Sequence, residues 1–240
     1  MRLDVALTTR GLVASRTEAQ NLIKSSQVQV DGKIVAKSSF DVSEDANIAI
    51  IGEACPYVSR GGYKLQAALE AFMVAPENRV CLDIGASTGG FTDCLLQHGA
   101  SFVYAVENGH GQLHQSLSNH PNVCSLEHYN ARELSKKDFP RPITLAVMDV
   151  SFISQTLILP ALAQVLEPGA ALITLIKPQF EVGRSHISKG GVVKDKAARK
   201  NAVDTVVAFA EQIGLSYKGI ITSPILGGDG NEEYLAYFTA

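Results

Sequence analysis

The sequence predicts a doubly wound α/β domain with a mostly parallel sheet, preceded by a small α+β domain. Three observations lead to this fold class. From about residue 79 to the end, apolar segments of strand length alternate with helical stretches. A glycine-rich turn follows the first of these strands. Within the first 55 residues, two helical stretches precede an Asp-Gly hairpin signal.

The amino-terminal elements follow from local signals. A glycine ends the first helix, and a serine followed three residues later by glutamate forms a capping pattern for the second. Alternating runs on both sides of Asp-Gly are typical of a two-residue hairpin. The expected elements are a helix over 1–10 ended by Gly11, a helix capped by Ser15 with Glu18, a hairpin over 28–35 about Asp31-Gly32, and a strand over 48–51.

This order of elements resembles the S-four-type RNA-binding domain of ribosomal proteins and RNA-modifying enzymes. The resemblance implies that residues 1–55 form an RNA-binding domain. Members usually carry glycine where this chain has Ser26. The matching residues are Ser15-Arg16, Ala19, Leu22-Ile23, Val28-x-Val30-x-Gly32 and Lys37.

The pattern changes after Pro56. We expect a linker over 56–63, interrupted by Gly61-Gly62, and an α/β domain over 64–240 whose first helix begins at about Lys64. Strands alternating with helices indicate a doubly wound, mostly parallel sheet. The expected strands lie near 79–84, 102–106, 143–148, 171–176, 218–222 and 234–239.

The composition is that of an ordinary globular protein, with 46% hydrophobic and 19% charged residues. No apolar run approaches the roughly 20 residues that cross a bilayer. The first residues also lack the apolar core of a secretory signal. We therefore expect a cytoplasmic protein without a membrane partner. The four cysteines form no Cys-x-x-Cys pair, so we expect neither a metal site nor disulfides.

Positive charge gathers in two segments although the net charge is −3. Residues 1–37 hold six basic and three acidic side chains, and residues 184–200 hold six basic and one acidic. Such segments suit a nucleic-acid surface. From charge alone, two solvated faces explain the pattern equally well.

The glycine-rich turn begins at Asp83 and reads Asp-x-Gly-x-x-x-Gly-Gly. Glycines let backbone amides approach a ligand closely beyond the strand end. A dinucleotide fingerprint would read Gly-x-Gly-x-x-Gly, so a pyrophosphate site is disfavoured. The acidic residue before the turn suits a ligand with an amino-acid group, such as S-adenosylmethionine (SAM). Glu107 ends the next strand and could bind both ribose hydroxyls of an adenosine. The alternative is a turn without a ligand.

Four further polar residues belong to the same edge of the predicted sheet. Asp149 and Lys177 each follow an apolar strand, Glu233 precedes the last strand, and Lys64 begins a helix. Ligands of doubly wound sheets bind at the carboxyl ends of the strands. Each residue alone would suit a structural ion pair, but together they indicate one site.

Lysine, aspartate, lysine and glutamate in this order resemble the tetrad of FtsJ-like ribose 2′-O-methyltransferases. The chain as a whole resembles the TlyA family, historically called hemolysins, which joins an S-four-type domain to a Rossmann-like, SAM-dependent FtsJ-like domain. It departs from the family pattern at Asn108 and His110. The matching strings are Ser59-Arg60-Gly61-Gly62-x-Lys64-Leu65, Asp83-Ile84-Gly85-x-Ser87-x-Gly89-Gly90-Phe91-Thr92, Asn130-Ala131-Arg132, Asp149-Val150-Ser151-Phe152-Ile153-Ser154, Lys177-Pro178-Gln179-Phe180-Glu181, Lys189-Gly190-Gly191-Val192-Val193 and Gly230-Asn231-x-Glu233-Tyr234.

The resemblance implies methylation of a cytidine 2′-hydroxyl in ribosomal RNA of the large subunit, with some members also modifying the small subunit. A ribose hydroxyl is a weak acid, and Lys177 can accept its proton only in the neutral form. The like charge of Lys64 and partial burial favour that form. Asp149 and Glu233 would orient the two amines, so Lys64, Asp149, Lys177 and Glu233 are the expected catalytic residues.

The resemblance also implies two sets of binding residues. The expected SAM contacts are Asp83, Gly85, Ser87, Gly89, Gly90, Phe91, Thr92, Glu107, Asn130, Ala131 and Asp149. The expected contacts to ribosomal RNA or ribosomal subunits are Arg2, Arg10, Arg16, Lys24, Lys37, Arg60, His110, Phe152, Arg184 and Lys189. Among these, Phe152 is expected to stack on an extruded base.

Three other functions remain as alternatives. A membrane-acting hemolysin is disfavoured because the sequence shows neither the pattern of a signal peptide nor that of a membrane-spanning segment. A protein that binds SAM and RNA without catalysis is disfavoured by the four-residue set. A base methyltransferase would commonly carry Asn/Asp-Pro-Pro-aromatic where this chain has Asp149-Val150-Ser151-Phe152. The sequence leaves the oligomeric state open.

Overall fold

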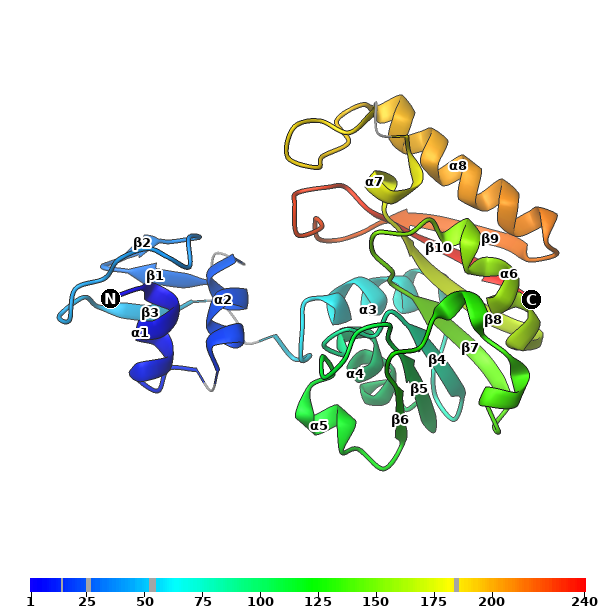
Figure 1. The fold of residues 1–240 in the computed structure, drawn as a ribbon, viewed down its shortest axis with the longest axis horizontal. Helices are drawn as coiled ribbons and strands as arrows, with labels where there is room; N and C mark the ends of the chain where they lie inside the picture. The colour runs from blue at the N-terminus through cyan, green and yellow to red at the C-terminus, as the bar shows by residue number, and fades with distance from the viewer. Residues whose placement is uncertain (14, 25–26, 52–54, 184–185) are drawn as a thin grey trace. The chain divides into compact units, whose positions relative to one another are not determined.

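The computed structural model describes residues 1–13, 15–24, 27–51, 55–183 and 186–240 (Figure 1). The chain divides into two compact units, Met1–Ala54 and Cys55–Ala240. Three residues of the sequence-based interpretation fall outside the description: Ser26, Arg184 and the side chain of Lys24. None of the helices in the described ranges is long and apolar enough to span a membrane.

The amino-terminal unit contains the predicted order of two helices, a hairpin and a strand. Asp31 and Gly32 adopt left-handed backbone angles (φ 50° and 78°), as a two-residue hairpin turn requires. Ser15 caps the second helix by accepting a hydrogen bond from the Glu18 amide at 3.1 Å. The elements are α1 (Leu3–Thr9), α2 (Arg16–Lys24), β1 (Val28–Val30), β2 (Lys33–Ile34) and β3 (Ile48–Ile50), with β1 antiparallel to both other strands.

A buried carboxylate organises the two helices of this unit. Asp4 is fully buried and accepts hydrogen bonds from Arg2 at 3.0 Å, and from Arg16 and Gln20 at 2.9 Å. The hydrogen bond from Arg2 is the main reason why the pKa of Asp4 is well below its usual range. Arg10 donates to three backbone carbonyls of residues 43–46. Three arginines that the sequence assigned to RNA thus have partners inside the unit.

Replacing Asp4 with alanine is expected to lower the free energy of unfolding of this unit by about 1–3 kcal/mol, because the hydrogen bonds to a buried, charged acceptor are lost. Since the folded-state pKa of Asp4 is depressed, its contribution is present above about pH 4 and is lost as the pH falls. Hydrogen-exchange protection factors of α1 and α2 should therefore differ less between wild type and variant at pH 3 than at pH 7. An equal difference at both pH values contradicts this account.

The larger unit is built on a seven-stranded sheet in the order β6-β5-β4-β7-β8-β10-β9. Neighbouring strands are parallel from β6 to β8, and only β10 runs antiparallel to its neighbours β8 and β9. This confirms the mostly parallel, doubly wound prediction. The strands are β4 (Val80–Ile84), β5 (Phe102–Val106), β6 (Val123–Leu126), β7 (Ile143–Met148), β8 (Leu166–Ile176), β9 (Ser216–Thr222) and β10 (Tyr234–Thr239).

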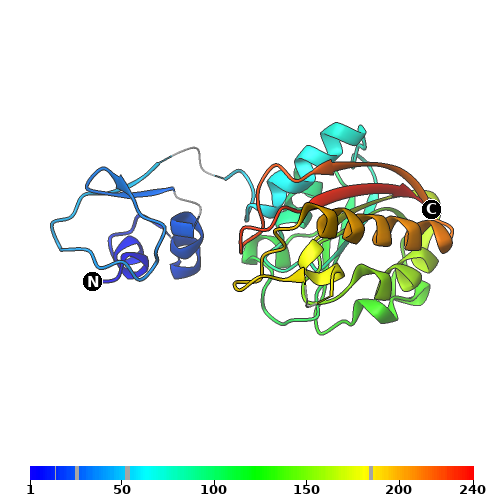
Figure 2. The ribbon, with the colours of Figure 1, turned by 90° about the horizontal axis from the view of Figure 1, so that it is seen from above.

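Helices cover both faces of this sheet, as Figure 2 shows for α3 and α8 on either side of β9 and β10. Alternate strand residues point to opposite faces, so Cys81 packs in one apolar cluster and Leu82 in the other. The first cluster includes side chains of α3 and α4, and the second includes those of α6 and α8. The helical segments are α3 (Gly61–Phe72), α4 (Gly90–Gln97), α5 (Gln115–Ser118), η1 (Ala131–Glu133), η2 (Lys136–Asp138), η3 (Gln155–Leu157), α6 (Leu159–Val165), α7 (Pro178–Glu181) and α8 (Lys196–Gln212).

The structure adds one strand to the predicted elements and corrects two expected boundaries. The strand β6 was not predicted, and β8 begins at Leu166, earlier than the expected residue 171. Helix α3 begins at Gly61 and contains both glycines, so Lys64 is its fourth residue. A Cβ on Gly62 would lie 2.2 Å from the ring of Tyr57, which is buried in the α3–α4 cluster. The glycine pair therefore allows close packing instead of interrupting the helix.

Candidate functional site

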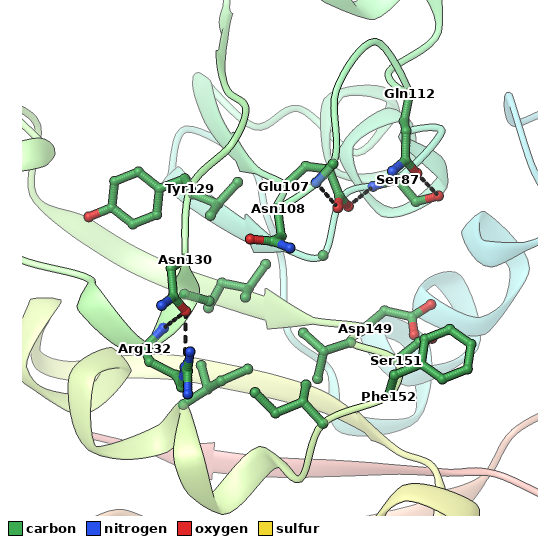
Figure 3. A pocket seen from close by; sticks show the side chains of 18 residues that line it. Ser87, Glu107, Asn108, Gln112, Tyr129, Asn130, Arg132, Asp149, Ser151 and Phe152 are labelled. Carbon is green, nitrogen blue, oxygen red and sulfur yellow. Dashed lines mark hydrogen bonds between the residues drawn. The ribbon is translucent and has the colours of Figure 1, made fainter.

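A pocket of about 680 Å³ opens at the carboxyl ends of β4, β5 and β7 (Figure 3). This is the edge at which doubly wound sheets bind ligands. Of the eleven residues expected to contact SAM, the pocket is lined by Gly85, Ser87, Glu107, Asn130, Ala131 and Asp149.

The glycine-rich turn after β4 brings backbone and carboxylate together. Gly85 has φ 81°, and a Cβ there would lie 2.4 Å from the carbonyl oxygen of Asp149. The Glu107 carboxylate accepts hydrogen bonds from the amides of Ser87 (2.9 Å) and Gly109 (2.8 Å), as Figure 3 shows. Two fixed donors hold this carboxylate in one orientation at the pocket wall. A group with neighbouring hydroxyls, such as a ribose, suits that position.

Asp83 lies beneath the turn and does not line the pocket. Its side chain is fully buried and accepts a hydrogen bond from Thr92 Oγ1 at 2.6 Å. Burial raises its pKa to about 7, and the nearby charge of Asp149 adds to that rise. Within the described part of the chain, its Oδ1 has no hydrogen-bond partner. The other expected SAM contacts that the pocket lining lacks are Gly89, Gly90, Phe91 and Thr92, which begin α4 or cap it.

Asn130 is held by its own turn. It caps η1, accepting from the Arg132 backbone at 3.2 Å and from the Arg132 side chain at 3.1 Å, while its amide donates to Glu133 at 2.8 Å. Sequence reasoning missed several polar lining residues that follow the same strand ends. They are Gln112, Tyr129, Arg132 and Ser151, and the lining also includes Asn108, which differs from the family pattern. Asn108, Gln112 and Ser151 follow the predicted strands β5 and β7, which was the signal that could have found them, whereas Tyr129 and Arg132 follow the unpredicted β6.

The four tetrad residues form two ion pairs. Lys177 Nζ lies 2.6 Å from Asp149 Oδ1 and donates a hydrogen bond to Ser151 Oγ at 2.8 Å. Lys64 Nζ donates to Glu233 Oε2 at 2.6 Å in a buried contact. The sequence had placed the two lysines beside each other, whereas the structure gives each amine a carboxylate partner of its own.

The reversed direction of β10 explains why Glu233 reaches this edge. Tyr234 at the start of β10 pairs with Ile176 at the end of β8. Glu233 immediately precedes Tyr234, and Lys177 immediately follows Ile176. The two residues therefore lie at the same edge of the sheet. Gly227 lies against the Glu233 carboxylate, since a Cβ there would be 2.3 Å from Oε1.

The expected RNA contacts of this unit differ in their surroundings. Phe152 lines the pocket, is 91% exposed and has φ 65°, a left-handed angle that is strained for a bulky residue. The His110 ring stacks on that of His128, with the ring centroids 4.9 Å apart, and its Nδ1 lies 2.7 Å from Glu127 Oε2. The remaining two, Arg60 and Lys189, are exposed.

A metal centre is not visible in the described ranges, where no three His, Cys, Asp or Glu side chains form a group able to hold an ion. The donor chemistry of the pocket fits SAM instead. Gly85 has no side chain at a position where a Cβ would collide with the Asp149 backbone. The Glu107 carboxylate is oriented by two backbone amides and can accept hydrogen bonds from hydroxyl groups.

Family profiles match both units. The FtsJ-like methyltransferase family matches residues 57–240, and the S4 domain matches residues 1–48. Among curated proteins, Hemolysin A of Brachyspira hyodysenteriae is 42% identical over 239 residues, which is 99% of each chain. The 16S/23S rRNA (cytidine-2′-O)-methyltransferase TlyA of Mycobacterium tuberculosis is 42% identical over 237 residues, covering 98% of this chain and 88% of that protein.

Solved structures give the same result. A candidate hemolysin from Streptococcus thermophilus has a TM-score of 0.80 at 42% identity, covering all of this chain and 88% of the other. A candidate SAM-dependent methyltransferase from Listeria monocytogenes has a TM-score of 0.55 at 14% identity, which shows a shared fold. The S4 domain implies an RNA substrate. The chain therefore belongs to the FtsJ-like, SAM-dependent methyltransferases and, by its full-length similarity, to the TlyA family.

Proposed function

We propose that this enzyme transfers a methyl group from SAM to the 2′-hydroxyl of a cytidine in ribosomal RNA. The observation that carries the proposal is the pair of lysine–carboxylate contacts, one of which involves the pocket-lining carboxylate of Asp149. The names of the M. tuberculosis relative and of a 34% identical Campylobacter jejuni relative, a 23S rRNA (cytidine-2′-O)-methyltransferase, support this substrate. The large subunit is the proposed target, the small subunit a second one, and the cytoplasm the place of action.

The pocket residues suggest how SAM is held. Glu107 is proposed to bind the ribose hydroxyls, since its carboxylate already accepts two backbone amides from one side. The Asn130–Ala131 turn is proposed to face the adenine, and the Gly85 turn with Asp149 to face the methionine end. Asp83 and Thr92 support that turn from below. Bound SAM supplies an electrophilic methyl group.

Lys177 is proposed to act as the base. In its neutral form, the Nζ atom accepts the proton from the ribose 2′-hydroxyl, and the oxygen becomes a competent nucleophile. Asp149 and Ser151, both in contact with Nζ, then stabilise the ammonium group that results. Lys64, held by Glu233, places a second amine at the same edge of the sheet.

The RNA is proposed to contact both units. Residues 1–55 are assigned as the RNA-binding domain and 64–240 as the methyltransferase domain; of the expected linker 56–63, residues 61–63 belong to α3. Because Arg2, Arg10 and Arg16 already have protein partners, the exposed lysines of the amino-terminal unit are the better phosphate contacts. Phe152 is proposed to stack on the target base, and its exposure and strained backbone support that role.

Transfer of labelled methyl groups from SAM to isolated ribosomal subunits tests the substrate class. We expect the label in ribosomal RNA. Label found only in ribosomal protein would contradict the proposal.

Replacing the exposed Lys33 and Lys37 together with alanine is expected to weaken binding to ribosomal subunits. The slope of log affinity against log salt should fall by about one unit for each lost phosphate contact. The rate at saturating RNA should stay the same. The matched control replaces Lys136 and Lys137, two exposed lysines of the larger unit, and should leave the slope unchanged. Equal slopes for wild type and both variants contradict the assignment.

A further inference from the structure

Two chain segments carry the groups that the proposed reaction uses. The first is 149–155, with Asp149 and Phe152, and the second is 177–181, with Lys177 and Phe180. Two contacts join them near these groups: Lys177 Nζ reaches Asp149 at 2.6 Å and Ser151 at 2.8 Å, and the centroids of the Phe152 and Phe180 rings lie 5.1 Å apart. Because the base and the stacking residue lie on different segments, the relative position of the segments matters for catalysis.

A third contact joins the same two segments through Glu181. Its Oε2 accepts a hydrogen bond from Ser154 Oγ at 2.6 Å, and its Oε1 accepts one from the Gln155 amide at 2.9 Å. Burial raises the pKa of Glu181, while these two donors act in the opposite direction. Both carboxylate oxygens are therefore used inside the protein.

Gln155 continues this connection into the sheet. Its side chain is 2% exposed, donates to the carbonyl of Leu175 at 2.6 Å and accepts from Thr174 Oγ1 at 2.8 Å. Both partners belong to β8, the strand that ends just before Lys177. The turn after Phe152 is thus tied to the strand that carries the proposed base.

Phe152 needs such support. A phenylalanine with φ 65° is strained, and 91% exposure means that packing contributes little to hold it. Strained residues persist where surrounding contacts over-determine them, and they gather at functional sites. The Glu181 contacts begin two residues after Phe152 and supply that constraint.

We propose that Glu181 is a positioning residue, which holds the 151–155 turn so that Phe152 and the proposed base Lys177 act on one nucleotide together. Glu181 is assigned no contact with RNA or SAM, since both of its carboxylate oxygens have protein partners. The proposal rests on the proposed function and deepens it, because it assigns the geometry of the target-nucleotide site to a half-buried carboxylate on the neighbouring segment.

A double-mutant cycle tests this role at saturating SAM and ribosomal subunits. Glu181→Ala is expected to slow methyl transfer by about 10- to 100-fold, since small misplacements of reacting groups have effects of this size. Glu181→Gln should recover most of the rate, because its amide oxygen still accepts from Gln155 and its amide nitrogen can donate to Ser154 Oγ. In a Phe152→Ala background, Glu181→Ala should slow transfer by no more than about threefold. If Glu181→Ala slows transfer by the same factor in the Phe152→Ala background as in the wild type, the proposal is overturned.

A second measurement does not depend on methyl transfer. Hydrogen exchange at the amides of residues 151–155 should be faster in Glu181→Ala, with the SAM dissociation constant unchanged. The matched control is Asp93→Ala, because Asp93 also accepts one backbone amide, from Val58 at 2.8 Å, and one side-chain donor. That control should leave both the exchange of 151–155 and the saturating rate unchanged. Unchanged exchange in Glu181→Ala overturns the proposal, whereas absent methylation by the wild type overturns only the proposed function.

Discussion

Lys177→Ala is expected to reduce methyl transfer by at least about 10³-fold, which lies within the range that a positioned general base contributes. The variant removes the amine that contacts Asp149 and Ser151 and leaves the pocket lining intact. The SAM dissociation constant and the thermal unfolding midpoint should therefore stay close to the wild-type values. Single-turnover transfer to ribosomal subunits at saturating SAM measures the effect.

Lys177→Arg separates base chemistry from charge. A guanidinium keeps the positive charge beside Asp149 but does not lose a proton in proteins, so this variant should also be inactive. The control Lys136→Ala removes an exposed lysine that does not line the pocket and should transfer at the wild-type rate. Near-normal transfer by either Lys177 variant contradicts the assignment of the base.

Gly85→Ala is expected to weaken SAM binding by at least about 100-fold. The new Cβ would lie 2.4 Å from the carbonyl oxygen of Asp149, and backbone atoms cannot turn away as a flexible side chain does. The φ of 81° adds strain for any residue with a Cβ. The turn after β4 and the segment after β7 must then separate, and both line the pocket. Isothermal calorimetry with SAM and with its demethylated product measures the loss.

Gly214→Ala is the matched control for this prediction. Gly214 has a similar left-handed angle, φ 96°, but a Cβ there meets nothing within 4 Å. Its replacement should lower stability by about 1 kcal/mol through backbone strain and leave SAM binding unchanged. If Gly85→Ala binds SAM as tightly as Gly214→Ala does, the pocket is not the SAM site.

Residues at strand ends could be predicted from the sequence because strand-length apolar runs are local signals. Glu107, Asp149 and Lys177 each follow such a run, and all three lie at the predicted edge of the sheet. The strand β6 was missed because its four residues, Val123–Leu126, are short and include a serine. The early part of β8 was missed because it contains Pro168-Gly169, a pair typical of turns.

Pairings between distant residues could not be predicted in the same way. The partner of Lys64 depends on β10 running antiparallel to β8, and the residues of a strand do not reveal its direction. Arg2 and Arg16 were likewise predicted to contact RNA because they add to the positive charge of the segment. A charge count does not show that both guanidinium groups contact the buried Asp4. Nor did the glycine pattern show that Asp83 faces the α3–α4 side of the sheet.

The measurement that tests the central claim most directly is the identity of the methylated nucleoside. Isolated ribosomal subunits are incubated with SAM and either wild-type protein or Lys177→Ala, and the ribosomal RNA is digested and analysed by mass spectrometry. We predict that 2′-O-methylcytidine appears with the wild type and is absent with the variant. A methyl group on a base, or 2′-O-methylcytidine formed equally by both proteins, would contradict the account.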